Sequence, residues 1–238
     1  MSEYANRLTV IPVPFDLGAG IRGAAEGPDA MRRSGLDACV NRLAAHPAIH
    51  DAVRVLGPSA AEHSETADAD APGIRHADAV AAVNRELADA VRRVAADRRF
   101  PLVLGGDHSI AIGSLAGLSA AYNRLGVIWF DAHSDLNTPD TSPSANAHGM
   151  SLAVALGLGD ERLTSIRGSR PPVDPANVVL IGARSLDDGE KSRIRELGIT
   201  CYTMHDIDRK GMARIMEESI ERLRDRTAGV HVGCDVDS

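Results

Sequence analysis

The chain has 238 residues, of which 44% are hydrophobic and 25% charged, so it can form one large α/β domain of ordinary globular composition. A formal net charge of -7 and an aromatic content of 3% argue against a general nucleic-acid-binding protein. The cysteines are few and widely spaced, no apolar run is long enough to span a membrane, and the first residues lack the apolar core of a signal peptide. We therefore expect a cytoplasmic protein that binds neither nucleic acid nor membranes.

The first elements are expected to alternate between strand and helix, beginning with a strand over residues 8–13. The glycine-rich loop that follows lacks the Lys-Ser/Thr ending of a phosphate-binding loop. Pro28 is a residue that the first turn of a helix tolerates, and a helix is predicted over residues 28–43. A second strand is predicted at residues 52–56, and the polar, acidic stretch over residues 57–76 predicts a surface loop.

The clearest predicted helix covers residues 77–98, because its apolar residues recur at steps of three and four and form one stripe. A short strand over residues 101–104 ends in Gly105-Gly-Asp-His-Ser109, whose paired glycines allow a tight turn close to a ligand. The next helix is expected to extend to Leu125 and to lead into a buried strand over residues 127–130.

The second half of the chain continues the alternation. A helix is predicted from His148 to about Leu158, and residues 160–177 are expected to form a loop. The remaining strands are expected at residues 178–181, 199–202 and 230–234, and the remaining helices at residues 189–197 and 212–223. Alternating strands and helices predict a mostly parallel sheet covered on both faces, which is a single-domain, three-layer αβα fold over residues 1–238.

Side chains of the types that bind metals follow three of the predicted strands. Asp131, His133 and Asp135 alternate directly after a buried strand, and an extended backbone points alternate side chains the same way. Ligands of such sheets lie outside the carboxyl ends of the strands, so all of these side chains are expected to meet at one edge. The expected ligands are His108, Asp131, His133, Asp135, Asp235 and Asp237.

This set of side chains favours two divalent cations. Four carboxylates would raise one another's pKa if no cation balanced their charge. Oxygen ligands with some imidazole favour Mn²⁺ over Zn²⁺, and two such ions can convert a shared water to hydroxide near neutral pH. The implied chemistry is metal-assisted hydrolysis. Two of these motifs, taken alone, allow simpler interpretations. Asp107 and His108 could cap the next helix, and the Asp235-x-Asp237 pair could be solvated.

Three segments resemble the metal motifs of the ureohydrolase superfamily, which contains arginases, agmatinases and formiminoglutamases. They are Gly105-Gly-Asp-His-Ser109, Asp131-Ala-His-Ser-Asp-Leu-Asn137 and Asp235-Val-Asp237. The resemblance implies an α/β fold and a dimanganese site built from the six expected ligands, with Asp131 and Asp235 bridging the two ions. It also implies a homotrimer or homohexamer.

Within the superfamily, residues 137–149 are most similar to the arginase loop that holds the amino-acid end of the substrate. This similarity implies that Asn137 and Ser144 contact the α-carboxylate, that Asp187 receives the α-ammonium, and that His148 shuttles protons. The residues alone support simpler roles: a polar turn for Asn137 and Ser144, a carboxylate at a helix N-terminus for Asp187, and local hydrogen bonding for His148.

The resemblance implies hydrolysis of L-arginine to L-ornithine and urea. A hydroxide bridging two Mn²⁺ would attack the guanidinium carbon, and Asp135 and His148 would relay a proton to the departing amine. Two alternatives stay open: another ureohydrolase, of the agmatinase, guanidinobutyrase or formiminoglutamase type, and a catalytically silent homologue.

The end of the sequence carries an expectation of its own. Arginases continue beyond the Asp-x-Asp motif, so a chain that ends at Ser238 is expected to be a C-terminally truncated fragment of an active enzyme. It would lack the last strand, leave two interior strand edges unpaired, and be poorly stable and inactive by itself.

Overall fold

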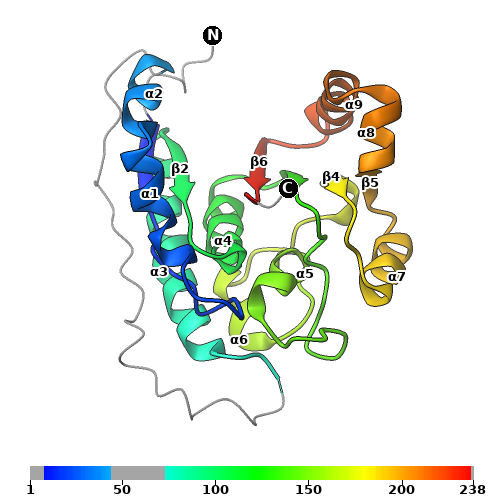
Figure 1. Ribbon diagram of the computed structural model, residues 1–238, viewed down its shortest axis with the longest axis horizontal. Coiled ribbons are helices and arrows are strands. Elements are labelled where there is room, and N and C mark those ends of the chain that lie inside the picture. Colours follow the sequence, from blue (N-terminus) through cyan, green and yellow to red (C-terminus); the bar gives the residue numbers. More distant parts are fainter. Residues whose placement is uncertain (1–7, 44–72, 237–238) are drawn as a thin grey trace.

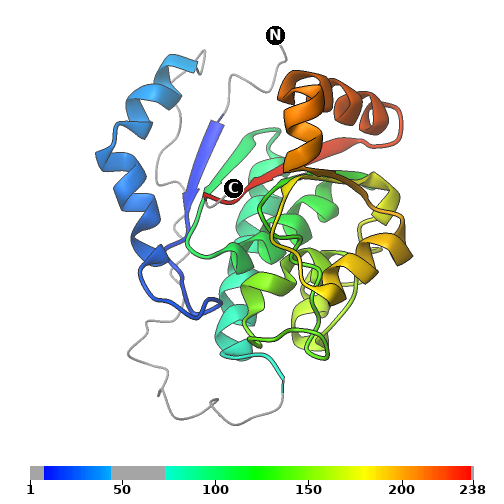
Figure 2. The same ribbon diagram turned by 45° about the vertical axis from the view of Figure 1, so that its right-hand side comes forward.

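A computed structural model describes residues 8–43 and 73–236 and contains a central layer of parallel strands (Figure 1). The strands are β1 (Leu8–Pro12), β2 (Phe100–Leu104), β3 (Leu125–Phe130), β4 (Val178–Ala183), β5 (Thr200–Thr203) and β6 (Gly229–Cys234). β1 pairs with β2, and the other strands form a sheet in the order β5-β4-β3-β6 (Figure 2). Every pair is parallel. The strand predicted at residues 52–56 lies outside the described residues.

Helices surround both sheets. They are α1 (Gly27–Arg33), α2 (Leu36–Leu43), α3 (Ala77–Ala96), α4 (Ala111–Ala121), α5 (Ser151–Ala155), α6 (Glu161–Thr164), α7 (Asp188–Leu197), α8 (Met204–Lys210) and α9 (Met212–Arg224). None of the helices in the two described ranges combines the length and the apolar character needed to cross a lipid bilayer.

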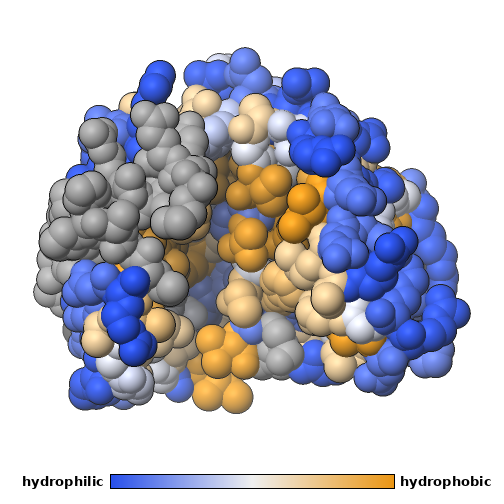
Figure 3. All heavy atoms as spheres, turned by 90° about the horizontal axis from the view of Figure 1, so that it is seen from above, coloured by the Kyte–Doolittle hydropathy of each residue, from blue (hydrophilic) through white to orange (hydrophobic). Residues whose placement is uncertain are grey.

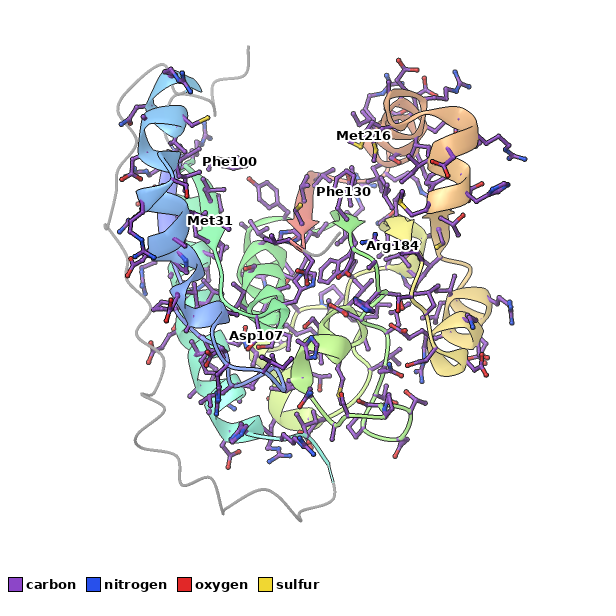
Figure 4. The ribbon with its side chains drawn as sticks, viewed as in Figure 1. Met31, Phe100, Asp107, Phe130, Arg184 and Met216 are labelled. Atoms are coloured by element: carbon purple, nitrogen blue, oxygen red, sulfur yellow. The ribbon has the colours of Figure 1, made fainter. Side chains whose placement is uncertain are left out.

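Alternate residues of the four-stranded sheet point to opposite helical layers, as the period of a strand requires. Trp129 and Leu180 pack with apolar residues of α4, α5 and α7 on one face. Ile128 and Ile181 pack with residues of α8 and α9 on the other face, where Phe130 and Met216 join them (Figure 4). The expected three-layer αβα fold with a parallel sheet is therefore confirmed.

The predicted apolar stripe of α3 is buried and forms the core beside the two-stranded sheet. Val80, Leu87 and Val91 are completely inaccessible to solvent and pack with residues of β1 and α4. The helix begins at Ala77 as predicted and ends two residues earlier than Arg98, at Ala96.

Several element boundaries differ from the predictions. The helix expected over residues 28–43 is two helices, because Gly35 has a φ of 95°, a conformation that suits glycine and breaks the helix. α4 ends at Ala121, so Leu125 belongs to the following strand and not to the helix. The loop expected over residues 160–177 contains α6, and α8 was not predicted at all.

β2 and β6 each have one edge that no strand in the described ranges pairs with. Exposed apolar side chains lie on both strands: Phe100 on β2 is 51% exposed, and Val230 and Val232 on β6 are 43% and 57% exposed. Seen from above, hydrophobic residues gather along a hollow near the middle of the molecule (Figure 3).

Candidate metal centre

The carboxyl ends of β2, β3 and β6 bring an imidazole and three carboxylates together. The Nδ1 atom of His108 lies 3.0 Å from Oδ2 of Asp131, 3.0 Å from Oδ2 of Asp135 and 3.1 Å from Oδ2 of Asp235. His108, Asp131 and Asp235 each offer a ligand atom, and these atoms lie within 4.8 Å of one another. The edge of the sheet therefore gathers donors of the kind that hold divalent cations.

Backbone hydrogen bonds fix the two aspartates that follow strands. The N–H of Asp131 donates to the carbonyl of Ile181 at 3.1 Å, and the N–H of Asp235 donates to the carbonyl of Phe130 at 3.0 Å. The indole N–H of Trp129 also donates to Oδ2 of Asp131 at 3.2 Å, and its ring stacks on His108 with 4.3 Å between the ring centroids. Two of the candidate ligands are thus oriented by the same buried side chain.

Asp135 reaches the cluster through a turn, so the expected extended alternation of Asp131, His133 and Asp135 is wrong. The carboxylate of Asp131 accepts the N–H of His133 at 2.8 Å, which turns the chain as soon as the strand ends. Asp135 then adopts a left-handed φ of 52°. This bend, and not a period of two, brings Asp131 and Asp135 to His108.

The glycines before His108 lie where a side chain would have no room. A Cβ at Gly106 would collide with the carbonyl oxygen of Phe15, so this turn packs directly on the loop after β1. The buried carboxylate of Asp107 accepts the N–H groups of Gly18 and Ser109, both at 2.8 Å, and thereby caps the short helical turn at residues 108–110 (Figure 4). Asp107 is therefore the helix cap that the sequence allowed, whereas the side chain of His108 belongs to the cluster.

The electrostatics of the cluster favour a positive charge at its centre. Burial alone lowers the pKa of His108, but the carboxylates of Asp131, Asp135 and Asp235 outweigh it and raise the pKa well above the usual value. Burial raises the pKa of Asp135 to about 6, although the charges of His108 and, more weakly, His148 lower it.

The residues present fit a bound divalent cation. Nδ1 of His108 and Oδ2 of Asp135 are buried, yet neither makes a well-formed hydrogen bond to any other described residue. One imidazole nitrogen can offer a single proton to the three carboxylate oxygens around it, so a proton cannot satisfy them all. A cation coordinated by the imidazole and the carboxylates would satisfy every one of these atoms.

Of the other two expected ligands, the structure describes only His133. The His133 side chain is 45% exposed, and its Nδ1 lies 3.3 Å from Oδ1 of Asp131, at the rim of the cluster. Asp237 lies outside the described residues. His148 follows the polar loop, and its backbone N–H donates to the carbonyl of Gly18 at 3.0 Å.

Two of the three expected substrate residues contact each other. Nδ2 of Asn137 donates to Oδ2 of Asp187 at 2.8 Å, and Asp187 caps α7 through its other oxygen. Ser144 is exposed, and its hydroxyl accepts the N–H of Asn146 at 3.3 Å. Within the described residues, no hydrogen bond joins Ser144 to Asn137 or Asp187.

Three residues near the centre were missed from the sequence: Trp129, Ser134 and Glu190. Glu190 is buried, and its carboxylate accepts the hydroxyl of Ser134 at 2.8 Å. A signal for it existed, because an aspartate followed three residues later by a glutamate is the pattern of a capping box, and the structure has this box at Asp187 and Glu190.

The fold and the cluster define an α/β protein with a candidate metal centre at the carboxyl edge of a parallel sheet. A sequence model described as "Arginase family" matches residues 6–238. The chain belongs to the arginase family, whose members are hydrolases.

Individual relatives agree with this assignment. The arginase of Bacillus caldovelox is 52% identical over 97% of this chain and 75% of its own length, and its solved structure superimposes with a TM-score of 0.86 at 50% identity, over 95% of this chain and 74% of that one. The arginase of Bacillus subtilis is 46% identical over 97% of this chain and 75% of its own length. An Entamoeba histolytica arginase solved in complex with L-ornithine gives a TM-score of 0.88 at 33% identity, over 98% of this chain and 76% of that one.

Proposed function

We propose that this chain carries the active site of an arginase that hydrolyses L-arginine to L-ornithine and urea. The observation that carries the proposal is the placement of three carboxylates around Nδ1 of His108, in a chain 52% identical to a protein named arginase. The Entamoeba relative solved with L-ornithine supports the choice of product.

The same residues would hold two Mn²⁺ ions. The proposed ligands are His108, Asp131, His133, Asp135, Asp235 and Asp237. Asp131 is suited to bridge two ions, because one of its oxygens faces His108 and the other faces His133. Asp235 would be the second bridging ligand, as the family resemblance implies. When bound, such a pair of ions supplies hydroxide near neutral pH by lowering the pKa of water.

Residues beside the cluster would bind and protonate the substrate. The side chain of Asp187, which Asn137 holds in place by a hydrogen bond, would receive the α-ammonium of the substrate. Asn137 and Ser144 would contact the α-carboxylate of the substrate. Asp135 and His148 interact electrostatically, and they would relay a proton to the nitrogen of the departing amine. The guanidinium carbon would then lie at the cluster while the amino-acid head lies toward α7.

The proposal is tested by measuring bound Mn²⁺ and released urea. Purified longer protein that contains this chain is expected to bind two Mn²⁺ per chain and, when loaded, to release urea from L-arginine. Agmatine, which lacks the α-carboxylate, is expected to be a much poorer substrate. The His108→Ala variant should lose metal and urea release together. Mn²⁺-loaded protein that released no urea from L-arginine would contradict the proposal, and a preference for agmatine would favour another ureohydrolase.

The proposal extends to location and assembly. We propose that the protein works in the cytoplasm, where its cysteines, free in the structure, would stay reduced. The family resemblance leads us to expect a homotrimer or homohexamer, which analytical ultracentrifugation would detect.

A further inference from the structure

Glu190 is a buried carboxylate that the proposed chemistry does not use. It lies in the first turn of α7, and only 4% of its surface is exposed. Its Oε1 accepts the N–H of Ser134 at 3.2 Å and the hydroxyl of Ser134 at 2.8 Å, and its Oε2 accepts the N–H of Asp187 at 3.1 Å. Hydrogen bonds to an ionised acceptor are strong, so these three donors fix the carboxylate firmly.

Ser134 lies between two candidate metal ligands, His133 and Asp135. The left-handed conformation of Asp135 is uncommon for a residue other than glycine and persists only where the surrounding structure holds it. Glu190 holds the residue before this turn, and the N–H of Ala153 donates to the carbonyl of Asp135 at 3.0 Å. The Glu190 carboxylate therefore supports the bend that aims Asp135 at the imidazole.

The same carboxylate also holds the substrate side of the site, because its Oε2 accepts the backbone N–H of Asp187 at 3.1 Å. Oδ1 of Asp187 accepts the N–H of Glu190 at 2.9 Å, which leaves Oδ2 to accept Nδ2 of Asn137 at 2.8 Å. Asn137 and Ser134 belong to one loop, so these contacts close a ring that runs from Ser134 through Glu190 and Asp187 to Asn137. Through this ring, the carboxylate of Glu190 reaches both halves of the site.

We propose that Glu190 is a positioning residue that couples the metal half of the site to the half that holds the amino-acid head of the substrate. This inference rests on the proposed function, because it takes residues 131–135 as metal ligands and Asp187 as a substrate ligand. Loss of the carboxylate frees Ser134, which precedes the bend at Asp135, and the backbone N–H of Asp187 together. Metal affinity and amino-acid affinity therefore fall together, although Glu190 is not among the ligands of either.

Two binding measurements test the coupling. Free Mn²⁺ is followed by electron paramagnetic resonance at equilibrium, and L-ornithine binding to Mn²⁺-loaded protein is followed by calorimetry. Glu190→Gln replaces one acceptor oxygen with a donor at the same size, and Ser134→Ala removes one donor while keeping the charge of Glu190. Asp187→Asn alters the substrate side alone. Glu196→Gln, an exposed position on the same helix, is the matched control.

We expect Glu190→Gln to weaken Mn²⁺ binding about tenfold or more, as losses of residues that support metal ligands commonly do, and to weaken L-ornithine binding as well. Ser134→Ala should weaken Mn²⁺ binding in the same direction. Asp187→Asn should weaken L-ornithine binding with unchanged Mn²⁺ affinity, and Glu196→Gln should change neither. Thermal unfolding of each variant verifies that it is folded. If Glu190→Gln does not fold, the Mn²⁺ affinity of Ser134→Ala decides whether the coupling exists.

Other outcomes overturn the inference. Unchanged Mn²⁺ affinity in Glu190→Gln would show that the ring does not support the ligands. A loss in Glu190→Gln without any loss in Ser134→Ala would assign the effect to charge and exclude the hydrogen-bonded link. Failure of the unmodified protein to bind Mn²⁺ would instead contradict the proposed function, so the two failures are distinguishable.

Discussion

Trp129 is the single tryptophan of the chain, and its completely buried side chain contacts two candidate ligands at once. Its ring stacks on His108, and its indole N–H donates to Asp131. Phenylalanine would keep an aromatic ring beside the imidazole and would lose the donor together with part of the ring volume. Trp129 therefore allows the orientation of one carboxylate to be tested without removing a candidate ligand.

We predict that Trp129→Phe weakens Mn²⁺ binding about tenfold, because a hydrogen bond to a charged group contributes about 1.5–3 kcal/mol. Titration of the variant with Mn²⁺, monitored by the signal of the free ion, gives the affinity. In the unmodified protein, bound Mn²⁺ should quench the tryptophan fluorescence, because the indole lies against a ligand. If Trp129→Phe and the unmodified protein bound Mn²⁺ with equal affinity and the tryptophan emission were unquenched, the metal would have to bind elsewhere.

Gly106 shows how one missing side chain permits the packing around His108. We predict that Gly106→Ala destabilises the protein by about 3 kcal/mol, at the upper end for overpacking, because its Cβ would overlap the carbonyl oxygen of Phe15. Gly149→Ala is the matched control, since nothing lies within 4 Å of a Cβ there. Chemical denaturation of both variants should show a loss for the first alone. Comparable losses would mean that the close approach to Phe15 is not what requires glycine.

At the scale of elements, Glu218 links α8 and α9 to the strand at the end of the sheet. Its carboxylate in α9 accepts hydrogen bonds from the Tyr202 hydroxyl of β5 at 2.9 Å, from Lys210 at 2.9 Å and from Arg214 at 3.0 Å. The donors Lys210, Tyr202 and Arg214 lower the pKa of Glu218 to about 2. One ionised side chain thus joins a strand to two helices.

We predict that Glu218→Gln lowers the Tm by a few degrees at pH 7. A carboxylate with a depressed folded-state pKa contributes stability above its unfolded pKa of about 4.3, and this stability is lost as the pH falls toward the folded value of about 2. The difference in Tm between the two proteins should therefore shrink below pH 4. Calorimetry over this pH range measures it, with the exposed neighbour replaced in Glu217→Gln as control. If the difference in Tm did not change with pH, the ionised carboxylate of Glu218 could not be the source of the stabilisation.

At the scale of the whole molecule, the unpaired edges of β2 and β6 expose backbone groups together with apolar side chains. Such edges favour pairing between chains, and a lysine placed on an edge opposes it. We predict that Val232→Lys, at a side chain 57% exposed, reduces self-association of this chain. Light scattering at increasing concentration measures the effect, with Ile220→Lys on α9, which is 53% exposed, as a control for apolar exposure away from the edge. Equal effects of the two variants would show that exposed apolar area, and not the edge, drives association.

The sequence was sufficient for features that depend on local pattern. The alternation of elements predicted the three layers, and the short-range motifs placed His108, Asp131 and Asp235 at one edge because parallel strands end there. The stripe on α3 was equally clear, since its period is that of one helical face. These features follow from residues that are neighbours in sequence.

Features that depend on tertiary contacts were not predictable in the same way. The bend at Asp135 is held by Glu190 and Ala153, which lie far along the chain, so an extended segment was the natural but wrong interpretation. The short helix α8 has too few turns to show a period, although Thr203 and Asp206 form the capping box at its start. Gly35 ends a helix through its backbone conformation, which composition alone does not reveal.

The cluster joins two sheets between which residues 8–43 and 73–236 form no strand pairing. His108 follows β2 in the two-stranded sheet, whereas Asp131 and Asp235 follow strands of the four-stranded sheet. A cation held by all three side chains would therefore act as a mechanical cross-link across the middle of the molecule. Such a cross-link would add to the apolar packing of α4 and α5, whose residues belong to the cores beside both sheets.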